Sequence, residues 1–132
     1  MFKSYALGLI ATVVVAVTSI ANANPLVYGT WASVQKIEDT SYTLTLAIQE
    51  KESSLSVTCA KGKKSTTARI TVPTEVTATQ IVIKGTAADQ KQLDDLDCSV
   101  EIAPMEFDYV LQGNTGLILS AQGQTIDFKR VK

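Results

Sequence analysis

Residues 42–48 read Tyr-Thr-Leu-Thr-Leu-Ala-Ile, and this stretch decides the fold class of the 132-residue chain. The tyrosine, the two leucines and the isoleucine fall on one side of an extended chain, and the threonines fall on the other. Alternation with a period of two is typical of a strand that has one face on a core and one in water. Threonine suits such a strand because β-branched side chains fit a pleated surface. We therefore expect a half-buried strand over 42–50.

The same alternation recurs along most of the chain, and short polar or glycine-containing turns separate the repeats. Pro73 is expected to end the fourth repeat because proline cannot donate to a ladder. The apolar phase changes between Val72 and Ile81, which predicts a turn or bulge there. Pro104 is expected to kink the sixth strand. The predicted strands are 27–37, 42–50, 54–60, 66–72, 76–84, 98–111, 116–121 and 124–131.

One segment departs from this pattern. Thr86 and Asp89 resemble a helix-capping pair, which predicts a short helix over Ala87–Leu96 with Leu93 and Leu96 against the sheet. We expect this helix to cover one end of the fold. With eight short strands linked mostly by hairpins, the chain predicts an all-β, eight-stranded antiparallel meander barrel with one short helix. A β-sandwich of the same strands is the alternative.

The first 23 residues have the pattern of a signal peptide. Lys3 precedes an uncharged apolar stretch, and Ala21-Asn22-Ala23 has the small-x-small form that signal peptidase reads. We expect residues 1–23 to be removed and residues 24–132 to form a single domain that is exported to a bacterial periplasm or secreted. No later segment approaches the roughly 20 apolar residues of a membrane span, so none is expected after cleavage.

The charge of the expected mature chain is close to neutral. Of the 12 basic residues only Lys3 is lost with residues 1–23, which leaves 11 basic and 13 acidic residues and a net charge of −2. This balance gives no electrostatic basis for binding nucleic acid. The chain contains no histidine, no nucleophile elbow and no phosphate-binding loop. We therefore expect neither an enzyme nor a cofactor or metal site.

Cys59 and Cys98 are the two cysteines of the chain. In an exported domain an even pair most simply forms one structural disulfide. A redox or metal-binding pair is the alternative, but Cys-x-x-Cys spacing is absent. Such a bond would bring the basic turn 61–64 close to the acidic residues of 94–101, and these charges are expected to pair.

Gly29-Thr30-Trp31 opens the first strand, and Arg130 lies in the last. The first and last strands of a closed meander are neighbours, so Arg130 is expected to stack on Trp31. This combination resembles the lipocalin and calycin superfamily. The resemblance implies an eight-stranded barrel in which Gly29, Trp31 and Arg130 are structural residues at the closed end. The stretch 117–131 is also similar to the terminal hairpin of small bacterial lipocalin-like domains.

The side chains expected to point inward are nearly all aliphatic or aromatic. Such a lining suits a packed core as well as a pocket, and the sequence favours a filled or nearly filled barrel. The candidates for a pocket mouth are Tyr28, Tyr42, Met105, Phe107 and Tyr109. The inward set comprises Leu44, Leu46, Ile48, Leu55, Val57, Ile70, Val72, Ile81, Ile83, Phe107, Tyr109, Leu111, Leu117, Leu119, Ile126 and Phe128.

These features predict an exported binding protein that carries or senses a small apolar ligand in the cell envelope. The alternative is a protein-interaction module, such as a secreted inhibitor, an adhesin-like subunit or an assembly accessory, that uses loops and strand edges. A hollow barrel favours the carrier. A filled barrel beside an exposed apolar patch or an open edge strand favours the interaction module.

Overall fold

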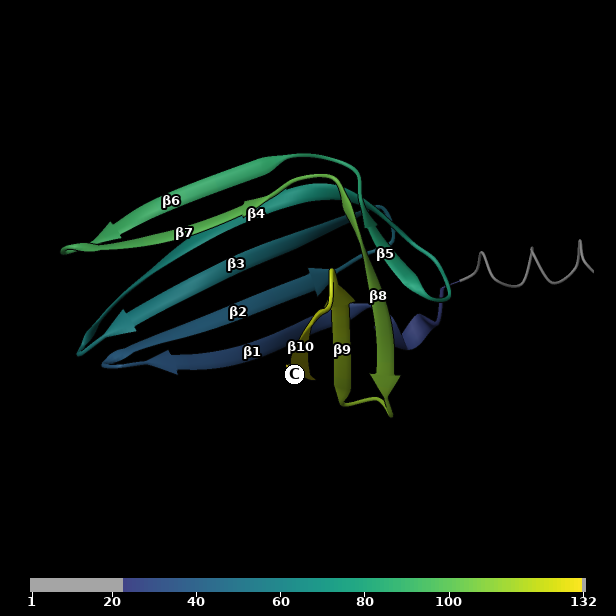
Figure 1. Cartoon of the computed structure of the whole chain (residues 1–132), viewed down its shortest axis with the longest axis horizontal. Helices are drawn as coiled ribbons and strands as arrows, with labels where there is room; N and C mark the ends of the chain where they lie inside the picture. The colour runs from purple at the N-terminus through teal and green to yellow at the C-terminus, as the bar shows by residue number, and fades with distance from the viewer. Residues whose placement is uncertain (1–22, 132) are drawn as a thin grey trace, which may run out of the picture.

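The computed structural model describes residues 23–131, most of which lie in strands (Figure 1). The expected signal peptide, residues 1–23, lies outside the described residues apart from Ala23. Within the described range a 3-10 turn, η1 (Pro25–Val27), precedes ten strands: β1 (Gly29–Ile37), β2 (Thr40–Ile48), β3 (Glu52–Lys61), β4 (Lys64–Val76), β5 (Gln80–Ile83), β6 (Ala87–Leu93), β7 (Leu96–Ile102), β8 (Met105–Gln112), β9 (Gly116–Ala121) and β10 (Gln124–Arg130).

Eight of these strands close into an antiparallel barrel in the order β1-β10-β9-β8-β5-β4-β3-β2. The structure therefore confirms the all-β class and the eight-stranded barrel, and the sandwich alternative is wrong. Neighbours in the barrel follow one another in the chain, except that the β6–β7 hairpin is inserted between β5 and β8. The architecture is thus a meander barrel with one projecting hairpin.

The barrel closes through two short ladders, which we call its corners. Long ladders join β1 through β4. By contrast, β1 meets β10 at Trp31–Arg130 and Ala32–Lys129, and β4 meets β5 over Thr74–Val76. Beyond the corners the strands diverge. Strands β1–β4 consequently run across the molecule side by side, while β8 and β9 are steeply inclined to them (Figure 1).

The prediction that Pro73 ends its strand is wrong, because β4 continues to Val76. Thr74 N donates to Lys51 O on the β3 side, whereas Pro73 O accepts from Lys84 N on the β5 side. The nitrogen of Pro73 therefore faces a position that β5 has already left at Ile83, and no ladder bond is lost there. The expected turn falls just after this strand, where the Thr77 hydroxyl accepts from the backbone N–H groups of Thr79 and Gln80. The strand predicted over 76–84 is accordingly reduced to β5.

The predicted helix over Ala87–Leu96 is wrong, because these residues form β6 and the start of β7. The two strands pair from Ala87–Ile102 to Leu93–Leu96. Asp94 turns the chain with a φ of 55°, a conformation that aspartate tolerates better than most residues. The apolar residues from Leu96 to Ile102 alternate, and they belong to the strand face that the hairpin buries. The single strand predicted over 98–111 is correspondingly divided at Pro104 into β7 and β8.

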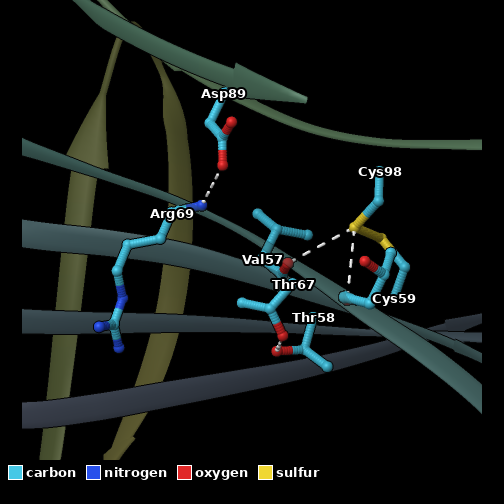
Figure 2. The surroundings of a disulfide bond; sticks show 8 residues. Val57, Thr58, Cys59, Thr67, Arg69, Asp89 and Cys98 are labelled. Atoms are coloured by element: carbon cyan, nitrogen blue, oxygen red, sulfur yellow. Dashed lines mark hydrogen bonds between the residues drawn. A yellow bond between two sulfur atoms is a disulfide. The ribbon is translucent and has the colours of Figure 1, made fainter. Parts of the chain in front are cut away.

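The β6–β7 hairpin packs over the part of the sheet that projects beyond the second corner. Val100 joins Ala68 and Ile70 of β4 in a small apolar cluster. Cys98 forms a disulfide with Cys59 of β3, which confirms the predicted bond, and both cysteines are fully buried (Figure 2). Cys98 Sγ also lies 3.5 Å from the carbonyl oxygen of Val57, a close contact and not a hydrogen bond, because a disulfide sulfur carries no proton.

Asp89 fastens the other strand of the hairpin to the edge of β4. Its carboxylate accepts the backbone N–H of Arg69 at 2.9 Å, as Figure 2 shows. This hydrogen bond and the ion pair with Lys91 hold the pKa of Asp89 below its ordinary value. A side chain thus occupies a backbone donor that would otherwise lie open on a strand edge.

We predict that the double substitution Cys59→Ala with Cys98→Ala lowers the free energy of unfolding by up to about 4 kcal/mol, because the bond closes a loop of 39 residues' separation in the unfolded chain. Urea denaturation of the two proteins measures this difference. Two titratable thiols in the native unchanged protein would contradict the disulfide.

We further predict that acid loosens the β6–β7 hairpin. Because the pKa of Asp89 is lowered in the folded protein, its contribution to stability is complete above the unfolded-state pKa and is lost as the pH falls through the folded-state pKa. Amide exchange of β6 should therefore accelerate at low pH, and Asp89→Ala should produce the faster exchange already at neutral pH. Equal exchange in both proteins at neutral pH would refute this assignment.

Candidate functional site

One end of the barrel is closed by Trp31 and Arg130. The Trp31 side chain is fully buried, and its Nε1 donates to Val27 O at 2.9 Å. The Arg130 guanidinium carbon lies 4.1 Å from the centroid of the indole ring. The sequence-based expectation that β1 and β10 bring these two residues together therefore describes the geometry at this corner.

Arg130 also binds three backbone carbonyl groups around the closed end. Its Nη1 donates to Tyr28 O at 3.1 Å, its Nε donates to Asn114 O at 2.6 Å, and its Nη2 donates to Leu26 O. A planar guanidinium offers its donors in a fixed fork, so one side chain holds η1, β1 and the β8–β9 turn together.

Gly29 is explained by the same guanidinium. Its φ of 129° is unfavourable for other residues, and a Cβ at this position would lie 2.6 Å from Arg130 Nη1. The Gly-x-Trp pattern and the terminal arginine are therefore one packing unit, in which glycine leaves room for the cation that covers tryptophan.

The other half of the barrel contains a cavity of about 290 Å³. It lies between the inner faces of β2–β4 and those of β5 and β8–β10. Glu101, Ala103 and Ile126 are the lining residues that are exposed to solvent, so the cavity opens between the β7–β8 connection and β10. The lining consists of Leu44, Leu46, Ser53, Ser54, Leu55, Val72, Ile81, Ile83, Glu101, Ile102, Ala103, Met105, Phe107, Leu119, Ile126 and Phe128. The expectation of a filled interior is thus wrong for this half of the barrel.

Two of the five candidate pocket residues, Met105 and Phe107, line this cavity. Tyr109 is buried at the closed end, where its hydroxyl donates to Thr77 O at 2.7 Å. Tyr28 lies beside Glu50 in a shallow hollow at the same end, and burial raises the pKa of its phenol, with Glu50 adding to the shift. Tyr42 is opposite Cys59 in the ladder and does not line the cavity.

Sequence reasoning found most of the lining among the predicted inward side chains but missed Ile102 and Ala103. These two residues reach the cavity because β7 ends beside it and the chain turns into β8. The alternation of Cys98, Val100 and Ile102 was the available signal. It was outweighed by the helix-like spacing of the preceding leucines.

The cavity wall offers a ligand almost no hydrogen-bonding group. The hydroxyl of Ser53 is already paired with that of Thr74 at 3.0 Å. Among residues 23–131, no buried side-chain nitrogen or oxygen lacks a hydrogen-bond partner. The same part of the chain contains no group of three or more His, Cys, Asp or Glu side chains placed to hold a metal ion. Recognition in this cavity therefore depends on apolar contact and shape.

The charged turns lie together at the far end of the molecule from Arg130. Lys64 pairs with Asp94 at 3.1 Å, and Lys61 lies 3.9 Å from Asp95. The expected pairing of the basic and acidic turns is therefore present. Because all four side chains are largely exposed, these pairs contribute little, about 0–1 kcal/mol.

The chain was compared with protein-family models, curated proteins and solved structures, and no match was found in any of the three. No helix in the described residues is long and apolar enough to cross a membrane. The resemblance to lipocalins accordingly stays a prediction, and so does the expectation that the protein is not an enzyme.

We predict that Trp31 and Arg130 are energetically coupled. In a double-mutant cycle with Trp31→Leu and Arg130→Met, the two losses of unfolding free energy should differ from additivity by about 1 kcal/mol, the usual strength of a partly desolvated cation–π contact. Denaturant unfolding of the four proteins measures the coupling. Simple additivity would show that the stacking does not stabilise this corner.

Proposed function

We propose that the protein is an exported, lipocalin-like carrier of a small apolar molecule that is held in the barrel cavity. The observation that supports this proposal is the apolar cavity of about 290 Å³ at the open half of the barrel. Ligand sites in proteins are typically concave, largely pre-formed and lined mainly by hydrophobic side chains, and this cavity has those properties at the small end of the usual range.

The volume limits the size of the ligand. An apolar cavity of about 150 Å³ in another protein accommodates benzene. By proportion, a cavity of about 290 Å³ suits a molecule of roughly ten to fourteen non-hydrogen atoms. The ligand class we propose is therefore a bicyclic or medium-chain hydrocarbon skeleton with few polar groups.

The position of Glu101 limits the charge of that ligand. Its residue stands at the mouth, next to Ile102 of the lining. A carboxylate there disfavours an anionic head group at close range. We therefore propose a neutral ligand and not a fatty-acid anion.

Two features support export. The N-terminal segment has the pattern of a signal peptide, and the fold contains a buried disulfide. Disulfides persist in oxidising compartments such as the periplasm and the extracellular space. We propose that the protein acts in the bacterial envelope or after secretion.

We predict that naphthalene binds the protein and raises its melting temperature, whereas pyrene, with its larger ring system, does not. Met105→Trp should abolish the effect of naphthalene because the indole occupies the cavity. Val110→Trp is the matched control, since Val110 is on the same strand but exposed on the outer face, and this variant should respond like the unchanged protein. Thermal unfolding with and without each hydrocarbon measures the shift.

A response of Met105→Trp equal to that of Val110→Trp would refute binding in the cavity. Absence of a naphthalene effect on the unchanged protein would refute the carrier proposal itself.

The open edge of β1 favours a second function, interaction with another polypeptide. Val34 and Ile37 are exposed on this strand, and β10 pairs with it at Trp31 and Ala32 only. Open edges of this kind add a strand from a partner. Purification of the protein from its own envelope, with native mass spectrometry, distinguishes the two functions by the mass of what accompanies it.

A further inference from the structure

The two corners of the barrel are treated differently by the structure. At the corner between β4 and β5, the diverging edge of β4 is covered by the β6–β7 hairpin, and Asp89 binds the N–H of Arg69 there. At the corner between β1 and β10, nothing in the described residues pairs with the diverging edge of β1 over Ser33–Ile37. Val34 is 70% and Ile37 51% exposed on this edge. This inference is independent of the cavity and its ligand.

The ladder at the corner shows which backbone groups face the open edge. Val131 N donates to Thr30 O, so the backbone groups of Thr30 point toward β10. Because these groups alternate in direction along a strand, those of Val34 and Lys36 point to the same side. Each of these two residues therefore presents an N–H and a C=O along an edge that β10 has already left.

We propose that the protein forms a two-fold symmetric dimer through antiparallel pairing of this edge in two copies, with Gln35 at the axis. In this register Gln35 lies opposite Gln35 of the second copy, Val34 lies opposite Lys36, and Ser33 lies opposite Ile37. Each Val34–Lys36 pair exchanges two backbone hydrogen bonds. The four bonds engage every N–H and C=O that these two residues direct to the edge.

A second copy fits this edge because the edge is complementary to itself. The unpaired stretch is centred on Gln35, so both copies align over Ser33–Ile37 without reaching Trp31 or Ala32, where β10 is already paired. A two-fold contact of this kind is isologous and closes at two copies. It also places the two β1–β4 sheets edge to edge as one continuous sheet.

The side chains agree with this register. Val34 lies opposite the aliphatic stem of Lys36 from the second copy, which covers an apolar side chain that is exposed in the single chain. No charged residue is directly opposite a like charge, an arrangement that would destabilise a strand pair. The two lysines are diagonal neighbours, so added salt should strengthen the dimer.

The test of the register is a cysteine pair at the axis. Gln35–Gln35 is a position without backbone hydrogen bonds, where Cα atoms of antiparallel strands lie about 4.5 Å apart. This separation suits a disulfide, which joins Cα atoms about 4.4–6.8 Å apart. Gln35→Cys should therefore cross-link two full chains under mild oxidation. Val34→Cys is the matched control, because it is displaced from its own symmetry mate by two residues along the strand, roughly 7 Å, and should remain uncross-linked.

Sedimentation of the protein tests the contact without a cross-link. The unchanged chain should sediment as a dimer, and Val34→Pro should weaken the dimer at least tenfold because proline removes the donor at the centre of the edge. This donor does not face β2, so the barrel should remain folded and naphthalene binding unchanged. Val34→Thr, which keeps the donor, should remain dimeric.

A monomer at high protein concentration would overturn the proposal. Equal cross-linking of Gln35→Cys and Val34→Cys would also overturn it, and this comparison remains valid if Val34→Pro does not fold. Association into larger species would show that the contact is not two-fold. None of these outcomes affects the carrier proposal, which naphthalene binding tests separately.

Discussion

Closure of the barrel through two short corners is the constraint on which the rest of the structure depends. At the first corner β1 and β10 share two residue pairs, so backbone hydrogen bonds alone give this junction little strength. Arg130 supplies what the ladder lacks. Its guanidinium covers Trp31 and binds carbonyl groups from η1, from the residue before β1 and from the β8–β9 turn. Gly29 leaves the space that this side chain requires.

The divergence of strands beyond the corners accounts for the other main features. Because β1–β4 project past β8–β10, the inner face of the projecting part needs its own cover. The β6–β7 hairpin provides this cover over β3 and β4, where the Cys59–Cys98 disulfide and the Asp89 carboxylate attach it. On the β1 side no equivalent segment is present in the described residues, and that edge is the one we propose for dimer formation.

The cavity follows from the same geometry. Large side chains such as Trp31, Ile48 and Leu117 fill the closed half of the barrel completely. In the other half the two sets of strands separate, and their apolar side chains meet across a gap instead of interlocking. An apolar cavity forfeits the contacts its walls would otherwise make, so a ligand that fills it restores dispersion contacts without requiring hydrogen bonds. This is the physical basis of the carrier that we propose.

The sequence by itself determined the all-β class, the eight barrel strands and the disulfide, because period-two alternation and an even cysteine pair are local or countable signals. It also indicated most of the cavity wall, since residues such as Leu44 and Phe107 have the parity of the inner face. Only the tertiary structure decided that Ala87–Ile102 is a hairpin and that Pro73 lies inside a strand. In both cases the outcome depends on partners distant in sequence: Cys59 and Arg69 hold the hairpin, and β5 ends beside Pro73. Whether the barrel is hollow was likewise decided by tertiary structure, because the same apolar side chains line a packed core or an empty one, and only the divergence of the strands at the corners separates them.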